Sequence, residues 1–342
     1  MAENHSVVVG IDGSPNSERA FEVALSVAEN RQWALRLVGA YVYPFVPEDQ
    51  FVRIADSYRR EAAQRVEEVL ERFSARARDA GVEVSTRTAE GDAGGLLVEE
   101  SRSAELAVVG KRGRNRFAGR FLGSVSGKLA AHAHCPTLVV PEKWEVEESG
   151  ALFAPQQERP EGPQSEHEPS TLMAESERSQ PQRRRFENVK EEHNFDSQVV
   201  AGVDVGQTST EIVLRAAEAA QMTRLPLTLV SAAPLNTDVY WYPNPVQHNL
   251  EIPKIRGKYT DHLKELSEQV SAEHPQLQVH WQFFDSTPAG VLSEASRTAA
   301  LVVIGTRGHG GFAGLLLGSV SQTVLNRAVA PVLVVPTKKH RR

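Results

Sequence analysis

Short apolar runs alternate with longer stretches of helical periodicity through most of this chain of 342 residues. The first run, 6–11, is rich in β-branched side chains, and residues 17–30 then carry apolar side chains three and four positions apart. The alternation continues and predicts strands over 6–11, 35–42, 82–88, 106–109 and 137–140, with helices over 17–30, 48–80, 95–103 and 123–134. Most of these strands are continuous apolar runs, which is typical of a parallel sheet covered by helices on both faces.

The same pattern occurs twice along the chain. Residues 110–126 align with residues 305–321, and eleven of the seventeen aligned positions are identical. The beginnings of the two halves also correspond, as do their closing P-x-L-V-V-P segments. We therefore predict two complete domains, over residues 1–141 and 198–337. Each is predicted to be a doubly wound, five-stranded parallel α/β sheet of the Rossmann type.

The segment between the halves, 142–197, has a different composition. It is rich in Glu, Gln, Ser, Pro and Arg and poor in aliphatic residues. Such a segment cannot bury enough apolar area to offset the entropy lost on ordering, so we predict a disordered linker. It would serve as a solvated tether or, alternatively, as a regulatory or partner-binding segment. Residues 338–342 form a short basic tail.

Composition narrows the class of protein. The formal net charge of −6 argues against a general nucleic-acid binder, which would carry a basic excess. No run approaches the roughly 18 apolar residues of a membrane-spanning helix. Cys135 is the only cysteine, which excludes an intrachain disulfide, and the N-terminus lacks the pattern of a secretory signal. We therefore expect a cytoplasmic protein.

Topology predicts where a ligand would bind. In a doubly wound sheet, ligands lie beyond the carboxyl ends of the strands where the strand order reverses. The first strand of each half ends near Asp12 or Asp204, and the fourth ends at Gly110 or Gly305. The carboxylate and the glycine-rich loop should therefore meet in one crevice in each half.

The glycine-rich loops share the spacing G-x2-G-x9-G-S. Gly110 would let the backbone approach a ligand closely, and Gly113 would permit a positive φ in the turn. Gly123 and Ser124 would open a helix whose free N–H groups, hydroxyl and positive dipole end suit phosphate, and Ser126 would add a donor. The equivalents in the second half are Gly305, Gly308, Gly318, Ser319 and Ser321. Glycines after a strand are often only turn formers, but retention of the full spacing in both halves favours a phosphate site.

The glycine spacing, the aspartate after the first strand and the closing P-x-L-V-V-P resemble the universal stress protein family in its tandem two-domain form. The resemblance covers about residues 5–141 and 197–337. It implies a strand order of 3-2-1-4-5 in each half and ATP, with Mg²⁺, bound in each. It also implies that the aspartates contact the nucleoside, that Ala40 and Ala232 lie against the adenine, and that the loops hold the phosphates. The implied site residues are Asp12, Ala40, Gly110, Gly113, Gly123, Ser124, Val125 and Ser126, and Asp204, Ala232, Gly305, Gly308, Gly318, Ser319, Val320 and Ser321.

The implied function is that of an ATP-binding stress-response regulator with an unidentified regulatory protein partner. Phosphoryl transfer needs a metal-bound carboxylate, a base and a cation on the γ-phosphate, and no general base is apparent in the sequence. We therefore predict a binding protein with no catalytic residue. The alternatives are a slow ATPase, a nucleotide-transferring enzyme on a similar fold, or an adaptor that acts through the linker.

Two other motifs are set aside. The segment 123–129 resembles a P-loop, but it has three residues rather than four between its glycines, and Leu129 follows Lys128. His132, His134 and Cys135 could suggest a metal site, but residues two apart on a helix point to different faces. We therefore predict no metal bound by the protein alone.

The two halves differ in ways that predict unequal sites. Gly206 replaces Ser14, so one possible ligand contact is missing from the second half. The first loop carries Lys111, Arg112, Arg114, Arg116 and Arg120, whereas the second carries only Arg307. These cations predict that the first site binds the more anionic ligand with the steeper salt dependence. The alternative is that they are solvated surface side chains with no role in binding.

The last strand of each half predicts how the halves assemble. Strand 137–140 is apolar and contains no lysine or proline to block edge pairing. We expect it to pair with its equivalent in the second half around a pseudo-two-fold axis, and we expect whole chains to form a homodimer.

Overall fold

The computed structural model describes residues 5–42, 52–113, 122–142, 144, 191–206, 209–235, 245–306 and 317–337, without the side chains of 52–56, 191 and 245–250. Most of the predicted linker and all of the predicted basic tail lie outside these residues. None of the described helices is long and apolar enough to cross a membrane.

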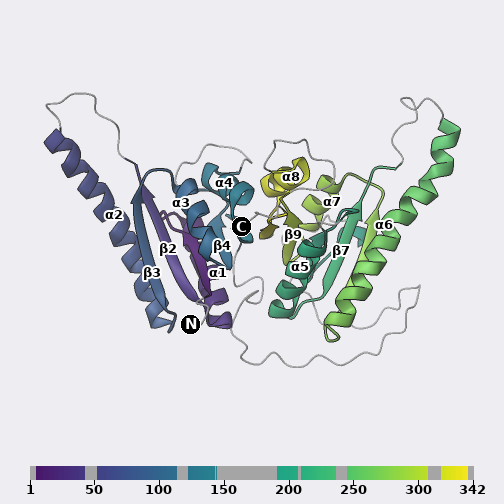
Figure 1. Cartoon of the computed structure of the whole chain (residues 1–342), viewed down its shortest axis with the longest axis horizontal. Coiled ribbons are helices and arrows are strands. Elements are labelled where there is room, and N and C mark those ends of the chain that lie inside the picture. The colour runs from purple at the N-terminus through teal and green to yellow at the C-terminus, as the bar shows by residue number, and fades with distance from the viewer. Residues whose placement is uncertain are drawn as a thin grey trace.

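Ten strands form one sheet that runs through both halves (Figure 1). The strand order is β3-β2-β1-β4-β5-β10-β9-β6-β7-β8, so each half has the predicted order 3-2-1-4-5. The strands are β1 (Ser6–Gly10), β2 (Ala34–Tyr41), β3 (Val84–Glu90), β4 (Leu106–Gly110), β5 (Thr137–Val140), β6 (Val199–Gly202), β7 (Leu227–Ala232), β8 (Val279–Phe284), β9 (Leu301–Gly305) and β10 (Val332–Val335).

The two halves join along an antiparallel seam between β5 and β10. All other strand pairs are parallel. At the seam, Val139 lies opposite Val332 and Leu138 opposite Leu333. The predicted pairing of the last strands within one chain is therefore confirmed.

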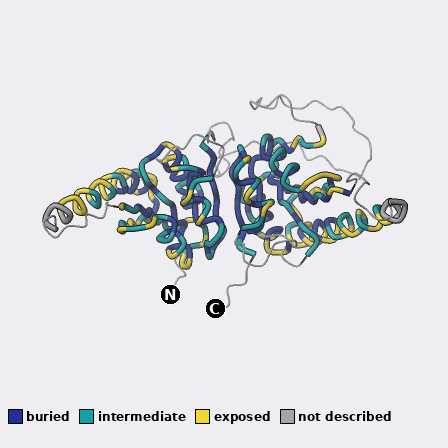
Figure 2. The backbone as a smooth tube through the Cα atoms, turned by 90° about the horizontal axis from the view of Figure 1, so that it is seen from above, coloured by how far each residue is buried: buried dark blue, intermediate teal, exposed yellow. Residues whose placement is uncertain are grey.

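Helices cover both faces of the sheet, as the apolar strands predicted. The helices are α1 (Pro15–Arg31), α2 (Val52–Asp79), α3 (Ala93–Glu100), α4 (Ser124–His132), α5 (Ser209–Thr223), α6 (Pro245–Glu273), α7 (Pro288–Ala295) and α8 (Ser319–Arg327). Residues of α1, α2, α5 and α6 form one buried cluster, and residues of α3, α4, α7 and α8 form another on the opposite face. The central strands are buried, whereas the outer strands β3 and β8 are largely exposed or half-buried, and the long helices α2 and α6 lie at the two sides of the molecule (Figure 2).

Two aromatic residues from the predicted linker pack on the folded halves. Trp144 is 8% exposed and joins the cluster beneath α1 and α2. Phe195 is 2% exposed, lies in the opposite cluster, and donates its N–H to Thr298 Oγ1 at 2.9 Å. The average composition of 142–197 does not reveal these two buried residues, because each is a single apolar side chain among polar ones.

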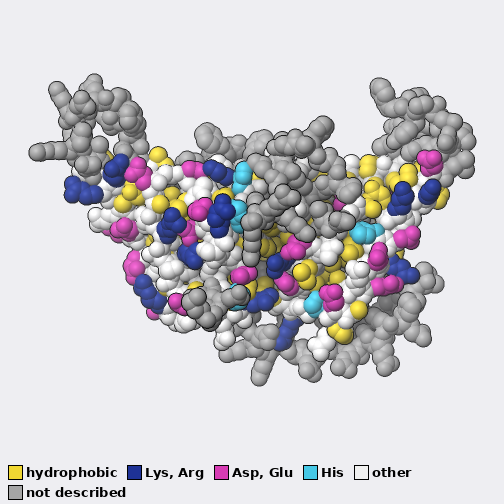
Figure 3. Space-filling view, in the orientation of Figure 1, with side chains coloured by type: hydrophobic (Ala, Val, Ile, Leu, Met, Phe, Trp, Pro, Cys, Tyr) yellow, Lys and Arg dark blue, Asp and Glu magenta, His cyan; other side chains and the backbone are white. Residues whose placement is uncertain are grey.

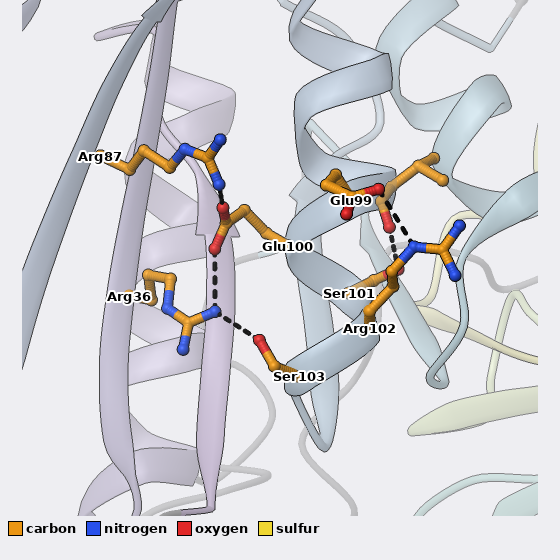
Figure 4. A network of polar contacts seen from close by, with 8 residues as sticks. Arg36, Arg87, Glu99, Glu100, Ser101, Arg102 and Ser103 are labelled. Atoms are coloured by element: carbon orange, nitrogen blue, oxygen red, sulfur yellow. Dashed lines mark hydrogen bonds and ion pairs between the residues drawn. The ribbon is translucent and has the colours of Figure 1, made fainter.

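On one face of the sheet, the first half carries a network of ion pairs and hydrogen bonds around Glu100 (Figure 4). In the first half, Glu100 at the end of α3 is 6% exposed and lies between Arg36 of β2 and Arg87 of β3. Arg36 Nη1 is 2.8 Å from Glu100 Oε2 and 2.9 Å from Ser103 Oγ. The buried carboxylate is thus compensated by ion pairs and hydrogen bonds.

In the second half, Thr228 and Gln282 take the register positions of Arg36 and Arg87, and an aromatic cluster lies on the same face of the sheet. Phe195 approaches Phe284 edge-on, with ring centroids 6.4 Å apart, and His193 stacks on the same ring at 4.9 Å. Sequence divergence between the halves is therefore large on this face, while the backbone topology is the same.

Candidate functional site

A cavity of about 320 Å³ opens at the carboxyl ends of the strands of the second half. Its lining includes the ends of β6, β7 and β9, the first turn of α8, and residues of α6 and α7. Seven of the eight residues predicted for this half line it: Asp204, Ala232, Gly305, Gly318, Ser319, Val320 and Ser321. Gly308 lies outside the described residues. Parts of the chain separated by more than a hundred residues thus meet where the topology predicted.

The first turn of α8 provides hydrogen-bond donors to this cavity. Gly318 is the N-cap, with φ −70° and ψ 155° and no side-chain cap. Its N–H donates to the Thr306 carbonyl at 2.8 Å, and the Gln322 N–H donates to the Gly318 carbonyl at 2.9 Å. The N–H groups of the three residues between them have no acceptor within the helix, because a helix begins with unpaired donors. Together with the helix dipole they suit an anion such as phosphate.

The hydroxyls of Ser126 and Ser321 have another role than the one predicted. Ser321 Oγ donates to the Gly305 carbonyl at 2.7 Å, and Ser126 Oγ donates to the Lys111 carbonyl at 2.9 Å. Each hydroxyl therefore ties the helix to the end of the preceding strand. Ser126 and Ser321 could therefore bind a phosphate only through their backbone N–H groups. Ser124 and Ser319, by contrast, are exposed.

The other part of the cavity is suited to a nucleoside. Asp204 is half-buried and accepts a hydrogen bond from the Val205 N–H at 2.8 Å. Ala232 ends β7 and is also half-buried. Tyr259 of α6, which the sequence did not suggest, lines the cavity with them. Burial, and secondarily the negative charge of Asp204, raise the pKa of Tyr259, so its hydroxyl stays protonated at neutral pH.

The first half repeats the helix start. Gly123 is the N-cap of α4, with φ −66° and ψ 155°. Its N–H donates to the Lys111 carbonyl at 3.0 Å, as Gly318 does to Thr306. Val125 is half-buried beside the core, as Val320 is, and Ala40 occupies a half-buried position late in β2.

Asp12 and the first glycine-rich loop meet, as predicted. A Cβ on Gly113 would lie 2.7 Å from Asp12 Oδ2, so only a residue without a side chain leaves the carboxylate in place. The predicted positive φ at Gly113 is wrong, because its backbone does not lie in the left-handed region. Gly110 also differs from expectation: its close neighbour is the Asn16 backbone carbonyl, 2.7 Å from where a Cβ would be. The first turn of α1 therefore requires that glycine.

Ser14 is a helix cap. It is 7% exposed, and its Oγ accepts from the Ser17 N–H at 3.2 Å at the start of α1. The hydroxyl that the sequence suggested as a ligand contact thus satisfies a helix donor. Its replacement by Gly206 changes how the helix begins, and Ser209 Oγ bonds the Asp204 carbonyl in the second half instead.

Lys111 is part of the interface between the halves. It is 8% exposed, and Nζ donates to the carbonyls of Asn326 at 2.9 Å and Ala328 at 2.8 Å. These carbonyls end α8, where a cation is favourable. The Leu122 N–H donates to Asn326 Oδ1 at 2.8 Å beside it. Lys111 therefore cannot serve as a free cation for phosphate, which removes one residue from the predicted charge asymmetry.

The other cations in the predicted charge difference between the two loops fall only partly within the described residues. Arg112 Nη1 lies 3.6 Å from Glu142 Oε2. Arg114, Arg116, Arg120 and Arg307 lie outside the described residues. Burial, with a smaller effect of Arg112, lowers the pKa of Lys111 to about 8.

The His-Cys segment shows no metal-binding arrangement within the described part of the chain, where no group of three His, Cys, Asp or Glu side chains could hold an ion. Cys135 is buried, and burial raises the pKa of its thiol to about 12. A thiol this buried is a core residue.

Comparison with known proteins decides the family. The model of the universal stress protein family matches residues 3–141 and 197–336, one match in each half. The chain belongs to the universal stress protein family. Universal stress protein Rv1996 of Mycobacterium tuberculosis is 30% identical over 349 residues, which cover 97% of this chain and 95% of that protein.

A solved structure of the family shares the fold. The crystal structure of a universal stress protein from Archaeoglobus fulgidus superposes with a TM-score of 0.63 at 16% identity and covers 99% of this chain and 100% of that one. A universal stress protein solved in complex with cAMP is 30% identical, covers 40% of this chain and 96% of its own, and has a TM-score of 0.31.

Proposed function

We propose that this universal stress protein binds one ATP in each half and regulates a protein partner according to the bound nucleotide. The observation that carries the proposal is the cavity of about 320 Å³ in the second half, which combines an open helix N-terminus with Asp204 and Ala232. The helix N-terminus suits the phosphates, and the aspartate and alanine suit the nucleoside. The volume falls in the range of about 300–1,000 Å³ typical of small-molecule sites.

Mg²⁺ would reach the site on the nucleotide. Asp204 is the only carboxylate among the described residues that line the cavity. One carboxylate is too few for a dedicated magnesium cage but suits an ion that keeps its waters and binds the phosphates of ATP. Mg²⁺ would neutralise phosphate charge there, and the N–H groups of α8 would orient the phosphate chain.

The lining favours binding over turnover. Among its described residues there is no histidine, lysine or arginine. Phosphoryl transfer is accelerated by a base that orients the nucleophile and by cations that stabilise the γ-phosphate. Steady production of ADP or AMP by the purified chain, lost with Asp204→Ala, would instead favour the alternative of a slow ATPase or a nucleotide-transferring enzyme.

The location and partners follow the sequence predictions. We propose a cytoplasmic protein that forms a homodimer and contacts a regulatory protein. On the face shown in Figure 3, the described cationic and acidic side chains are interspersed, unlike the single-sign surface typical of nucleic-acid binders.

The test is to count nucleotides per chain in matched variants. Ser124 and Ser319 are the exposed first residues of α4 and α8. A glutamate at either position suits the helix dipole but repels phosphate. We expect equilibrium dialysis to find two ATP per unmodified chain, one in Ser124→Glu or Ser319→Glu, and none in the double variant.

A charge elsewhere on the same helix provides the control. Gln322 of α8 is exposed and does not line the cavity, so Gln322→Glu should retain both nucleotides. An unmodified chain that binds no ATP, or serine variants that still bind two, would refute the proposal.

A further inference from the structure

We infer that Tyr259 is a nucleoside-binding residue of the second site alone, so that the two sites of one chain select nucleotides differently. The inference rests on the proposed nucleotide function and identifies a residue that neither the glycine spacing nor the aspartate reveals. Its basis is the position of the tyrosine, the group beside it, and the residue that replaces it in the first half.

Tyr259 reaches the cavity from a different side than the phosphate-binding turn. It belongs to α6, which packs on the sheet face opposite α7 and α8. Its ring packs on Phe283 of β8, with centroids 5.4 Å apart and an interplanar angle of 37°. The ring is therefore held by packing, which leaves its polar end for the cavity that it lines together with Asp204.

Tyr259 carries a hydrogen-bond donor and lines the same cavity as Asp204, which carries acceptors. Burial, and secondarily the charge of Asp204, raise the pKa of the Tyr259 phenol, which stays protonated at neutral pH. A phenol that can donate and a carboxylate that can only accept form a complementary pair. This pair fits adjacent hydroxyls of a ribose or the polar edge of a purine. It does not suit phosphate, which the carboxylate repels, so it would fix the nucleoside half of the ligand.

The residue of the first half that aligns with Tyr259 carries no hydroxyl. The buried residues of the two long helices align at a constant offset, with Leu70 matching Leu263 and Phe73 matching Leu266. The same offset matches Tyr259 with Val66. Val66 packs closely over β2, because a Cβ on Gly39 would lie 2.5 Å from its Cγ1. An aliphatic side chain there can contact a ligand but cannot donate to it.

The experiment measures the second site in the full-length chain. Ser124→Glu silences the first site, and Tyr259→Phe is added to remove only the hydroxyl. Losing one hydrogen bond should weaken ATP binding about fivefold by isothermal titration calorimetry. Tyr58→Phe, on an exposed tyrosine of α2, is the matched control and should leave the affinity unchanged. An unchanged thermal melt would show that the folded state is intact.

Nucleotide analogues identify what the pair recognises. If the ribose is bound, 2′-deoxy-ATP or 3′-deoxy-ATP should bind more weakly than ATP, and Tyr259→Phe should abolish the difference. If the base is bound, ITP should bind more weakly than ATP, and Tyr259→Phe should abolish that difference. The first site, isolated with Ser319→Glu, should discriminate less among these ligands.

Equal affinity of Tyr259→Phe and its parent for every analogue, with ATP still bound at one per chain, would overturn the inference and leave the proposed function intact. Absence of ATP binding by the parent chain would overturn both. The outcomes therefore separate the two claims.

Discussion

Individual glycines in the first loop are required by different neighbours. At Gly113 the neighbour is the terminal oxygen of Asp12, at 2.7 Å from a Cβ, whereas at Gly110 it is the backbone carbonyl of Asn16 at the same distance. A carboxylate can rotate away from a methyl group, but a backbone carbonyl at the start of a helix cannot move without shifting α1. The same substitution should therefore have a functional effect at one glycine and a structural effect at the other.

We expect Gly113→Ala to change the free energy of unfolding by less than about 1 kcal/mol, while it displaces Asp12 and weakens ATP binding at the first site. Gly110→Ala should cost about 1–3 kcal/mol by overpacking. Urea unfolding and calorimetry, both in a Ser319→Glu background, measure the two quantities. Equal losses of stability in the two variants would contradict this assignment.

Serine and lysine side chains near the sites show why residue type alone is a poor guide to role. Ser14, Ser126 and Ser321 all lie next to predicted ligand positions, yet each hydroxyl bonds the backbone. Ser124 and Ser319 lie two residues before Ser126 and Ser321 in the same helical turns, and they are exposed. Sequence predicts that serines gather at the helix start, but the orientation of each hydroxyl depends on which carbonyl lies within reach.

At the scale of elements, helix α8 of the second half also contacts the first half. Its first turn lines the cavity of the second half, and its last carbonyls accept from Lys111 of the first half. In Figure 1, α4 and α8 lie near each other above the seam. The equivalent of Lys111 in the second half is Thr306, whose Oγ1 is 2.9 Å from Thr337 Oγ1. The contact between the halves is therefore not symmetric.

We expect Lys111→Met, which keeps much of the volume and removes the donors, to lower the free energy of unfolding by about 1–3 kcal/mol. The buried amine should also give stability a pH signature. Its folded pKa of about 8 is below the usual 10.5, so between these values the unfolded chain binds more protons. Stability of the parent relative to Lys111→Met should rise from pH 8 to pH 10.5 and stay flat below pH 8.

Denaturant unfolding at neutral and alkaline pH measures both effects. Lys111→Arg is a useful control because it keeps the charge and does not titrate in this range. Parallel pH profiles for the parent and Lys111→Met would show that the amine is not buried as described.

At the scale of the whole molecule, the β5–β10 seam turns two domains into one sheet. Val139 and Val332 face each other there, and both are 2% exposed. An unpaired charge at this position would be buried in the seam, at a cost of several kcal/mol. The seam joins the last strands of the two halves.

We expect Val139→Asp to separate the halves or unfold them, with a larger radius of gyration by small-angle X-ray scattering and faster proteolysis. Thr86→Asp, on an exposed position of the outer strand β3, is the matched control and should change neither. A Val139→Asp chain with unchanged scattering and protease resistance would contradict the role of the seam.

Much of the architecture could be predicted from the sequence. Hydrophobic periodicity predicted the strands and helices of the first half within a few residues, including 137–140 without error, because these signals act between near neighbours in the chain. The start of the second helix, predicted at residue 48, lies outside the described residues. The repeat and the topology also predicted that Asp204 and the second glycine-rich loop would share a cavity.

What the sequence determined, then, is the repeat, the order of elements and the crevice where an aspartate meets a helix start, since strand polarity and turn chemistry follow from local residues. Only the tertiary structure decided which polar side chains face the cavity. Lys111 bonds carbonyls 215 and 217 residues away, and Tyr259 of α6 lines the same cavity as Asp204, which follows β6. Such partners depend on how the faces of distant elements pack. The local pattern of residues along the chain does not specify which distant faces meet.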